Sequence, residues 1–131
     1  MSVWIFQAVP KEYDLKKELR ERRDDWWRVT RLWKEMRKGD GVIFWQAGKE
    51  SGIYGVGELT SNLYPAEPKF RVKVKYTSKF SPPIFKNKLL KHPVLKGLSI
   101  LQQPYQGTNF RATVEQWNAL GLIGPSDMVA V

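Results

Sequence analysis

The sequence predicts an α+β fold, a small twisted β-barrel of about five to six strands flanked by helices. Two observations predict strands. Residues 41–59 have the pattern of a glycine-rich hairpin, and residues 70–76 alternate strictly between apolar and basic side chains. A third predicts a helix, because Thr113 and Gln116 have the spacing of a reciprocal capping box. With 131 residues the chain can build one sizeable core, so we expect a single domain over residues 1–131.

Caps, periodicity and chain breakers predict the other elements of the first half. In order, they are a strand at 3–8, a helix capped by Asp14 to about residue 23, an extended segment at 26–29 and a helix from Thr30 to Lys38.

The second half is predicted in the same way. Its elements are a proline-bearing loop at 62–68, a short helix around 87–91, an extended segment at 98–103, a helix from Thr113 that Gly121 stops and a closing strand within 125–131.

The hairpin suggests a ligand site. Trp45 and Gln46 lie on its first arm, and Gly55 and Gly57 leave one face of its second arm bare. Such glycines provide space either for a close backbone approach or for a ligand. An aromatic plate, an amide and a space would suit a flat, hydrogen-bonding ligand such as a nucleobase. The other interpretation is a tightly packed barrel that needs glycine at its corners.

Composition excludes several kinds of site. The chain has no cysteine, which excludes disulfides, thiolate zinc sites and cysteine nucleophiles. It has one histidine, His92, which excludes histidine-rich metal sites. No apolar run has the length of a membrane span, and the first residues lack the layout of a signal peptide. We therefore expect a cytoplasmic protein that has no membrane contact and needs no metal or cofactor.

The net charge of +9 is unevenly distributed. Residues 68–114 hold ten basic and no acidic side chains, whereas the rest of the chain nearly balances 12 basic against 13 acidic ones. Such an excess favours a polyanionic partner, most often nucleic acid, over a general solubility charge. Alternation places Arg71, Lys73 and Lys75 on one solvent face, where they could follow phosphates roughly 6–7 Å apart. Lys79 and Arg111 complete the predicted phosphate-binding set.

Three separated motifs occur in a characteristic order: residues 4–10, the hairpin from 39 to 57, and residues 107–113 followed by 115–117. Together they resemble the EVE family of the PUA-like superfamily, which also contains the YTH readers of methylated adenine. The resemblance extends from about residue 3 to residue 122. It implies a compact barrel with a pocket for a flipped-out modified base. Some family members stand alone, and others are fused to nucleases or to GTP-driven motors of modification-dependent restriction systems.

The resemblance also implies the pocket residues. In YTH relatives an aromatic cage holds the base, and one tryptophan comes from the segment after the first helix, here Trp26 and Trp27. We expect one of the two to stack on the base, and we favour Trp26 because Trp27 shares a side with Val29. The other implied positions are Gln7, Ala8, Trp45, Gln46, Ala47, Gly48, Tyr64 and Asn109.

Structural roles compete with several of these assignments. Trp45 would also suit a core, Gln7 and Gln46 the surface, and Asn109 a turn. The tryptophans expected in the core, since each lies on the apolar period of its own element, are Trp4, Trp33 and Trp117.

These observations predict a monomeric reader that binds a modified base in nucleic acid, with DNA favoured, and that has no catalytic activity. A nuclease or NTPase, as partner or as fused domain, would fit the family. One alternative is an RNA-binding PUA-like module. The other is an enzyme acting on a nucleotide-like molecule. It is disfavoured because Glu50 and Glu58 are the only carboxylates within residues 41–59 of the hairpin and no two acids have a catalytic spacing.

Overall fold

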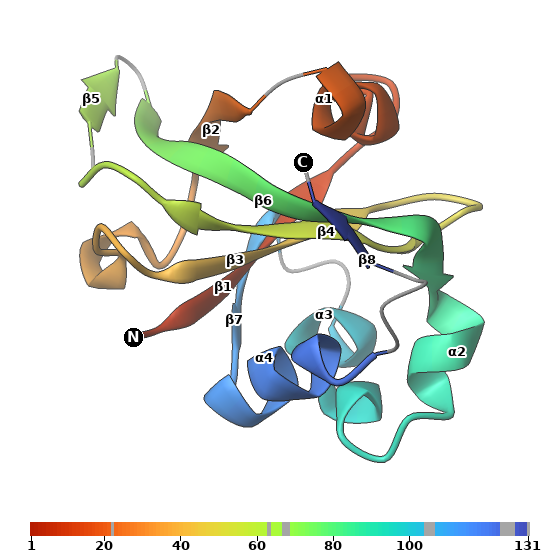
Figure 1. Ribbon diagram of the computed structural model, residues 1–131. Helices are drawn as coiled ribbons and strands as arrows, with labels where there is room; N and C mark the ends of the chain where they lie inside the picture. The colour runs from red at the N-terminus through yellow and green to blue at the C-terminus, as the bar shows by residue number, and fades with distance from the viewer. Residues whose placement is uncertain (22, 63, 67–68, 104–106, 124–127, 131) are drawn as a thin grey trace.

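The computed structural model shows one curled, mixed β-sheet with helices on both faces (Figure 1). It describes residues 1–131 except 22, 63, 67–68, 104–106, 124–127 and 131. The strands run along the sheet in the order β2-β6-β4-β3-β1-β7, while β5 and β8 each pair with β6. The predicted α+β class is confirmed.

The strands are β1 (Val3–Ala8), β2 (Asp24–Val29), β3 (Gly41–Gln46), β4 (Gly52–Leu59), β5 (Tyr64–Ala66), β6 (Lys69–Phe85), β7 (Asn109–Ala112) and β8 (Met128–Ala130). The helices are α1 (Leu15–Glu21), α2 (Lys86–Leu90), α3 (Ser99–Gln102) and α4 (Val114–Gly121), with single 3₁₀ turns at Trp33–Glu35 and Leu95–Gly97. The pair β1–β3 is parallel and every other pair is antiparallel. None of the helices in the described ranges is long and apolar enough to cross a lipid bilayer.

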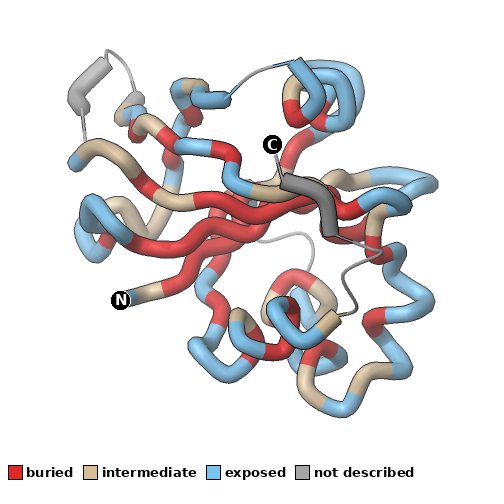
Figure 2. The backbone as a smooth tube through the Cα atoms, viewed as in Figure 1, coloured by how far each residue is buried: buried red, intermediate tan, exposed pale blue. Residues whose placement is uncertain are grey.

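Two hydrophobic cores lie on opposite faces of the sheet, because neighbouring residues of a strand point to opposite sides. Ile5, Ile43 and Trp45 pack toward the helices α2, α3 and α4. Phe6 and Phe44 pack on the other face, toward α1 and the curled-over β2. Figure 2 shows the central strands as the most continuously buried part of the chain. Of the three tryptophans expected in the core, Trp4 is fully buried. Trp33 and Trp117 are partly buried, and each packs against one of the two cores.

Gly55 and Gly57 serve the close approach of β6. A Cβ atom on Gly57 would lie 2.0 Å from the carbonyl oxygen of Lys75, and one on Gly55 would lie 2.7 Å from that of Ser78. Both distances are far below a van der Waals contact. The tightly packed interpretation of the hairpin is therefore confirmed, and the ligand-space interpretation of these glycines is wrong.

The predicted helix from Thr30 to Lys38 is wrong. This segment forms only the single 3₁₀ turn at Trp33–Glu35, and Leu32 before it has a left-handed φ of 62°. The backbone N–H of Thr30 donates to Oδ1 of Asn109 over 2.8 Å, so this residue ties two parts of the sheet together instead of capping a helix.

The extended segment predicted at 98–103 is also wrong, because Ser99–Gln102 forms the short helix α3. Its apolar residues suit strand alternation and a helical turn equally, and packing of Ile100 into the core selects the helix. Other predictions are confirmed. Thr113 and Gln116 form the reciprocal capping box of α4, and Oδ1 of Asp14 accepts from the N–H of Lys17 at the start of α1.

Candidate functional site

A cavity of about 610 Å³ opens where the two ends of the curled sheet approach each other. It is called the edge pocket below. Its lining residues from β1 and the loop after it are Gln7, Ala8, Val9, Glu12 and Tyr13; those from β2 and its end are Trp26, Trp27, Arg28 and Thr30; Arg71 and Thr108 complete it.

The pocket exists because β2 has an open edge. Among the residues that the structure describes, β2 pairs with β6 alone. Its other edge faces the ends of β1 and β7, and each described hydrogen bond across that gap involves at least one side chain. Besides the bond from its N–H to Asn109, Thr30 places its Oγ1 3.3 Å from Oγ1 of Thr108. These two contacts of Thr30 close one part of the gap, and the part beside them that stays open forms the pocket.

Trp26 and Trp27 line the pocket from opposite faces of β2. Trp27 is only 8% exposed and packs against Tyr13, with ring centroids 4.8 Å apart, and against Phe44 at 5.4 Å. Trp26 is 44% exposed. The predicted alternation, with Trp27 and Val29 on the inner side, is confirmed. One indole therefore forms a fixed wall, and the other stands at the rim.

A chain of hydrogen bonds beneath the pocket holds the inner indole in place. Tyr13 donates its hydroxyl hydrogen to Oδ2 of Asp25 over 2.6 Å. Since that hydrogen is used, the contact of 2.6 Å between Tyr13 Oη and Tyr76 Oη requires Tyr76 as donor. Nε1 of Trp27 in turn donates to Tyr76 over 2.8 Å. Every link has its partner, so the orientation of the Trp27 ring is fixed before any ligand arrives.

Burial raises the pKa of both tyrosines in this hydrogen-bond network. Desolvation raises the pKa of Tyr76 to about 12, against the lowering effect of its bonds with Tyr13 and Trp27. Desolvation, followed by the bonds to Asp25 and Tyr76, raises the pKa of Tyr13 well above its usual range. Both phenols therefore stay neutral around neutral pH and keep their hydrogens for the network.

The mouth of the pocket is cationic. Arg28 on β2 lies directly opposite Arg71 on β6 in the strand register. Like charges so placed repel each other, and an anion between them would relieve that repulsion. Glu12 is the one acid among the described residues that line the pocket. This arrangement suits a ligand with an anionic group outside and a flat polar body inside.

Only part of the implied pocket set lines this cavity. Gln7 and Ala8 do, and Nε2 of Gln7 donates to the carbonyl oxygen of Gly107 over 2.9 Å. Trp45 does not, because alternation along β3 points it into the opposite core, where it is 4% exposed. Its assignment to the pocket is corrected here.

The residues after Trp45 form contacts at the end of the β3–β4 hairpin and also lie outside the pocket lining. Nε2 of Gln46 donates to Oη of Tyr54 over 3.1 Å, and the N–H of Ala47 donates to the carbonyl oxygen of Ala8 over 2.9 Å. Gly48 has a φ of +99° in the turn.

Asn109 supports the pocket from behind. Its side chain is buried, and its Oδ1 already accepts from Thr30, so it does not line the cavity as implied. The backbone of Tyr64 in β5 pairs with that of Arg71 in β6. The side chain of Tyr64 lies outside the described part of the structure.

The predicted phosphate-binding set divides into two groups. Arg71, Lys73 and Lys75 share the outer face of β6, as alternation predicts. Folding also brings acids to two of them, which the sequence did not reveal. Nζ of Lys73 lies 3.9 Å from Oδ2 of Asp24, and Lys75 stands opposite Asp24 on β2 and opposite Glu58 on β4.

The other two residues of that set lie elsewhere. A bulge in β6, where Tyr76 and Ser78 pair with consecutive residues of β4, separates Lys79 from the first group. Lys79 lines a different hollow beside α1. Arg111 is held by Glu35 at 3.0 Å and lies over the ring of Trp4 at 4.6 Å. Arg111 therefore has two protein contacts while its side chain remains 48% exposed, and its phosphate role stays a prediction.

Sequence reasoning missed six lining residues: Val9, Glu12, Tyr13, Arg28, Thr30 and Thr108. The signal for Arg28 was present, since it shares the strand face of Trp26. The others lie in loops or at strand ends, where periodicity carries no information.

Asp40 and His92, both outside the pocket, have structural partners. Asp40 accepts from Nε1 of Trp4 and from the N–H of Arg37, each over 2.9 Å. Nδ1 of His92 accepts from the N–H groups of Val94 and Leu95. Within the described residues, no three His, Cys, Asp or Glu side chains are grouped as metal ligands would be.

Comparisons with solved structures place the fold among known ones. A hypothetical protein from Leishmania major superposes with a TM-score of 0.78 at 16% identity, covering 92% of each chain. A protein from Pseudomonas syringae gives 0.75 at 19% identity, covering 90% of this chain and 96% of the other. Human THYN1, solved in complex with DNA containing 5-methylcytosine, gives 0.72 at 17% identity and covers 95% and 100%.

At these identities the structural similarities show the fold alone. A search among curated proteins found no match. The model of the EVE domain, however, matches residues 2–121, nearly the whole length of the chain. The chain therefore belongs to the EVE domain family.

Proposed function

We propose that this protein is a reader of nucleic acid that holds a flipped-out modified base in the edge pocket, with DNA as the favoured partner. The observation that carries the proposal is the combination at the open edge of β2. A fixed indole, Trp27, and an exposed one, Trp26, stand beside the opposed cations Arg28 and Arg71. The DNA complex of THYN1, which shares the fold, supports the choice of DNA.

Different residues of the edge pocket would stack on the base, hydrogen-bond to its edge and bind phosphate. A base that leaves its duplex loses a few kcal/mol of stacking and pairing. Stacking on an aromatic ring returns about 1–3 kcal/mol per base, and Trp26 at the rim is the ring placed to provide it. Gln7 and Glu12 line the same cavity and supply an amide and a carboxylate for the hydrogen-bonding edge of the base. Arg28 and Arg71 would hold phosphate outside, which adds affinity but no base selectivity.

A binding panel tests the proposal. Oligonucleotides of one sequence would carry 5-methylcytosine, 5-hydroxymethylcytosine, N6-methyladenine or no modification, each as DNA and as RNA. We expect at least one modified DNA to bind more tightly than its unmodified counterpart. Equal affinity for all DNAs would contradict the proposal, and a stronger preference among the RNAs would favour the RNA-binding alternative.

Tryptophan variants locate the site within the same panel. Trp26→Ala should weaken binding of the preferred oligonucleotide by about 1–3 kcal/mol without loss of thermal stability. Trp33→Ala removes the same side chain outside the pocket and should leave affinity unchanged. Trp45→Ala should instead destabilise the fold by roughly 3–5 kcal/mol, since it empties a core position. If Trp26→Ala binds like the wild type, the edge pocket is not the base site.

A further inference from the structure

A second hollow, of about 570 Å³, lies between α1 and β6. We call it the α1–β6 groove. It forms where β6 separates from β4: the register pairs Gly55 with Lys79 and resumes only at Ile53 with Ile84. Pro82 and Pro83 occupy the gap, and proline has no N–H to donate to a neighbouring strand. The interruption is thus built into the sequence of β6.

The floor of the groove is apolar and aromatic. Phe80 and the two prolines line it, and Tyr54 and Phe85 stand edge to face with ring centroids 6.4 Å apart. Phe85 is 39% exposed, which is unusual for a phenylalanine on a strand. Flat apolar surfaces are therefore open to solvent here.

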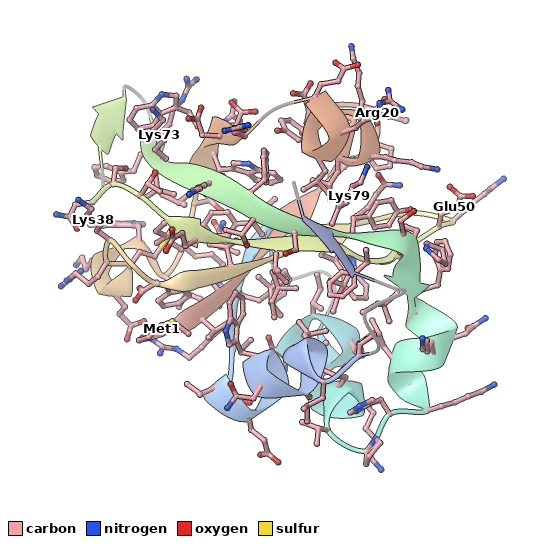
Figure 3. All side chains as sticks on the ribbon, viewed as in Figure 1. Met1, Arg20, Lys38, Glu50, Lys73 and Lys79 are labelled. Carbon is pink, nitrogen blue, oxygen red and sulfur yellow. The ribbon has the colours of Figure 1, made fainter. Side chains whose placement is uncertain are left out.

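The rim of the groove is basic. Lys16 and Arg20 approach from α1 and Lys79 from β6, and none of the described lining residues is acidic (Figure 3 labels Arg20 and Lys79). Arg20 has an exposed contact with Glu21 at 3.5 Å. On the other side of the ridge formed by Pro82, Pro83 and Phe85, Lys88 and Lys91 line a further hollow. The ridge thus has cations on both sides.

The groove lies next to the base site along the chain. Tyr13 lines the edge pocket and Lys16, three residues later, lines the groove. Even a fully extended chain spans at most about 11 Å over three residues. The two hollows therefore lie close together near the start of α1, and a ligand longer than one nucleotide could contact both.

From this arrangement we infer that the α1–β6 groove binds the nucleic-acid strand that flanks the flipped base. Phosphates would contact Lys16 and Lys79, and bases or sugars would pack on Phe85 and the prolines. A cationic groove with aromatic platforms is the general solution for single-stranded nucleic acid, because every base has a flat face. The inference rests on the proposed function for the choice of nucleic acid, but it concerns a separate set of residues.

Binding of oligonucleotides of two lengths distinguishes the edge pocket from the α1–β6 groove. The probes are single-stranded DNAs of 4 and 16 nucleotides with a central 5-methylcytosine, and the unmodified 16-mer. Lys79→Glu should weaken binding of both 16-mers about tenfold and leave the 4-mer within a factor of two. Lys38→Glu makes the same charge change on another part of the surface (Figure 3) and should have a much smaller effect. Phe85→Ser, which keeps all charges, should weaken the 16-mers about threefold.

Each result has one meaning. Equal losses from Lys79→Glu and Lys38→Glu, or unchanged 16-mer binding in Lys79→Glu and Phe85→Ser, would overturn the inference. If these two variants instead lose binding only to a polyglutamate peptide, the groove is a protein contact and the inference is wrong. Failure of the proposed function shows separately, as equal binding of modified and unmodified 16-mers by the wild type.

Discussion

At the residue scale, alternation along a strand distinguished the tryptophans of β2 but could not decide the role of Trp45. The period of two placed Trp27 inward and Trp26 outward, as observed. For Trp45 the same period leaves two faces, and both faces of β3 are buried under separate cores. When both faces of a strand are buried, apolar residues do not alternate with polar ones. The local sequence of β3 therefore does not indicate which of the two cores Trp45 joins.

The Tyr13–Tyr76 pair leads to a prediction about alkaline pH. An ordinary tyrosine has a pKa near 10, and burial raises the pKa of Tyr76 to about 12 and that of Tyr13 further. The stability that this pair contributes is complete below pH 10 and is lost as the pH rises toward 12, because only the unfolded chain releases the protons. We expect a loss on the order of 1–3 kcal/mol over this interval.

Thermal unfolding between pH 9 and 11.5, with absorbance at 295 nm to follow phenolate, checks this prediction. Tyr76→Phe should be less stable than the wild type at pH 8, but its stability should fall less steeply above pH 10. If all five tyrosines ionise near pH 10 in a protein that stays folded, the raised pKa values are wrong.

At the element scale, β6 decides where the basic charge is presented. Its 17 residues run much further than the alternating segment 70–76, and the bulge after Tyr76 divides it. Alternation predicts the first half only, because Pro82 and Pro83 interrupt the pattern of the second half. Cross-strand neighbours such as Asp24 and Glu58 are set by the register, which local sequence does not encode.

This register predicts unequal roles for the cations of the outer face. Arg71 faces Arg28, whereas Lys73 and Lys75 have acidic neighbours that partly neutralise them. Arg71→Ala should weaken modified and unmodified DNA equally and flatten the slope of log affinity against log salt by roughly 1. Lys75→Ala should change the slope less.

Arg111→Ala serves as the comparison, since Arg111 is engaged with Glu35 and Trp4. Titrations at several salt concentrations would give all three slopes. A salt slope in Arg71→Ala equal to that of the wild type would place the phosphates on another surface.

At the scale of the whole molecule, the pocket depends on contacts between distant parts of the chain. Thr30 and Asn109, 79 residues apart, close the sheet beside it. The hairpin, the basic strand and the helices capped by Asp14 and Thr113 each have local signals and were predictable. The meeting of the two sheet ends has none, because it arises from the accumulated twist of six strands. The family resemblance, not periodicity, indicated that Gln7 and Trp26 would lie near one another.

The whole arrangement also predicts that the protein binds without cutting or modifying its ligand. Hydrolysis of a phosphodiester or a glycosidic bond needs a water activated by a metal or by a tuned base. Among the described lining residues of the edge pocket Glu12 is the only carboxylate, and Asp25 below the pocket already accepts from Tyr13. Beside two arginines, Glu12 is suited to hydrogen bonding with a base, and within the described lining no second acid stands by it to share a metal or a proton.

We therefore expect no cleavage and no base release from modified DNA or RNA, with magnesium, manganese or zinc supplied, under conditions where binding is saturated. Denaturing gels and chromatography of released bases would detect either product. Glu12→Gln is the decisive variant, because it removes the only acid of the described pocket lining and keeps the shape of the side chain. Metal-dependent product that disappears in Glu12→Gln would establish an enzyme. Product of equal amount in both proteins would not depend on Glu12 and would indicate a contaminating nuclease.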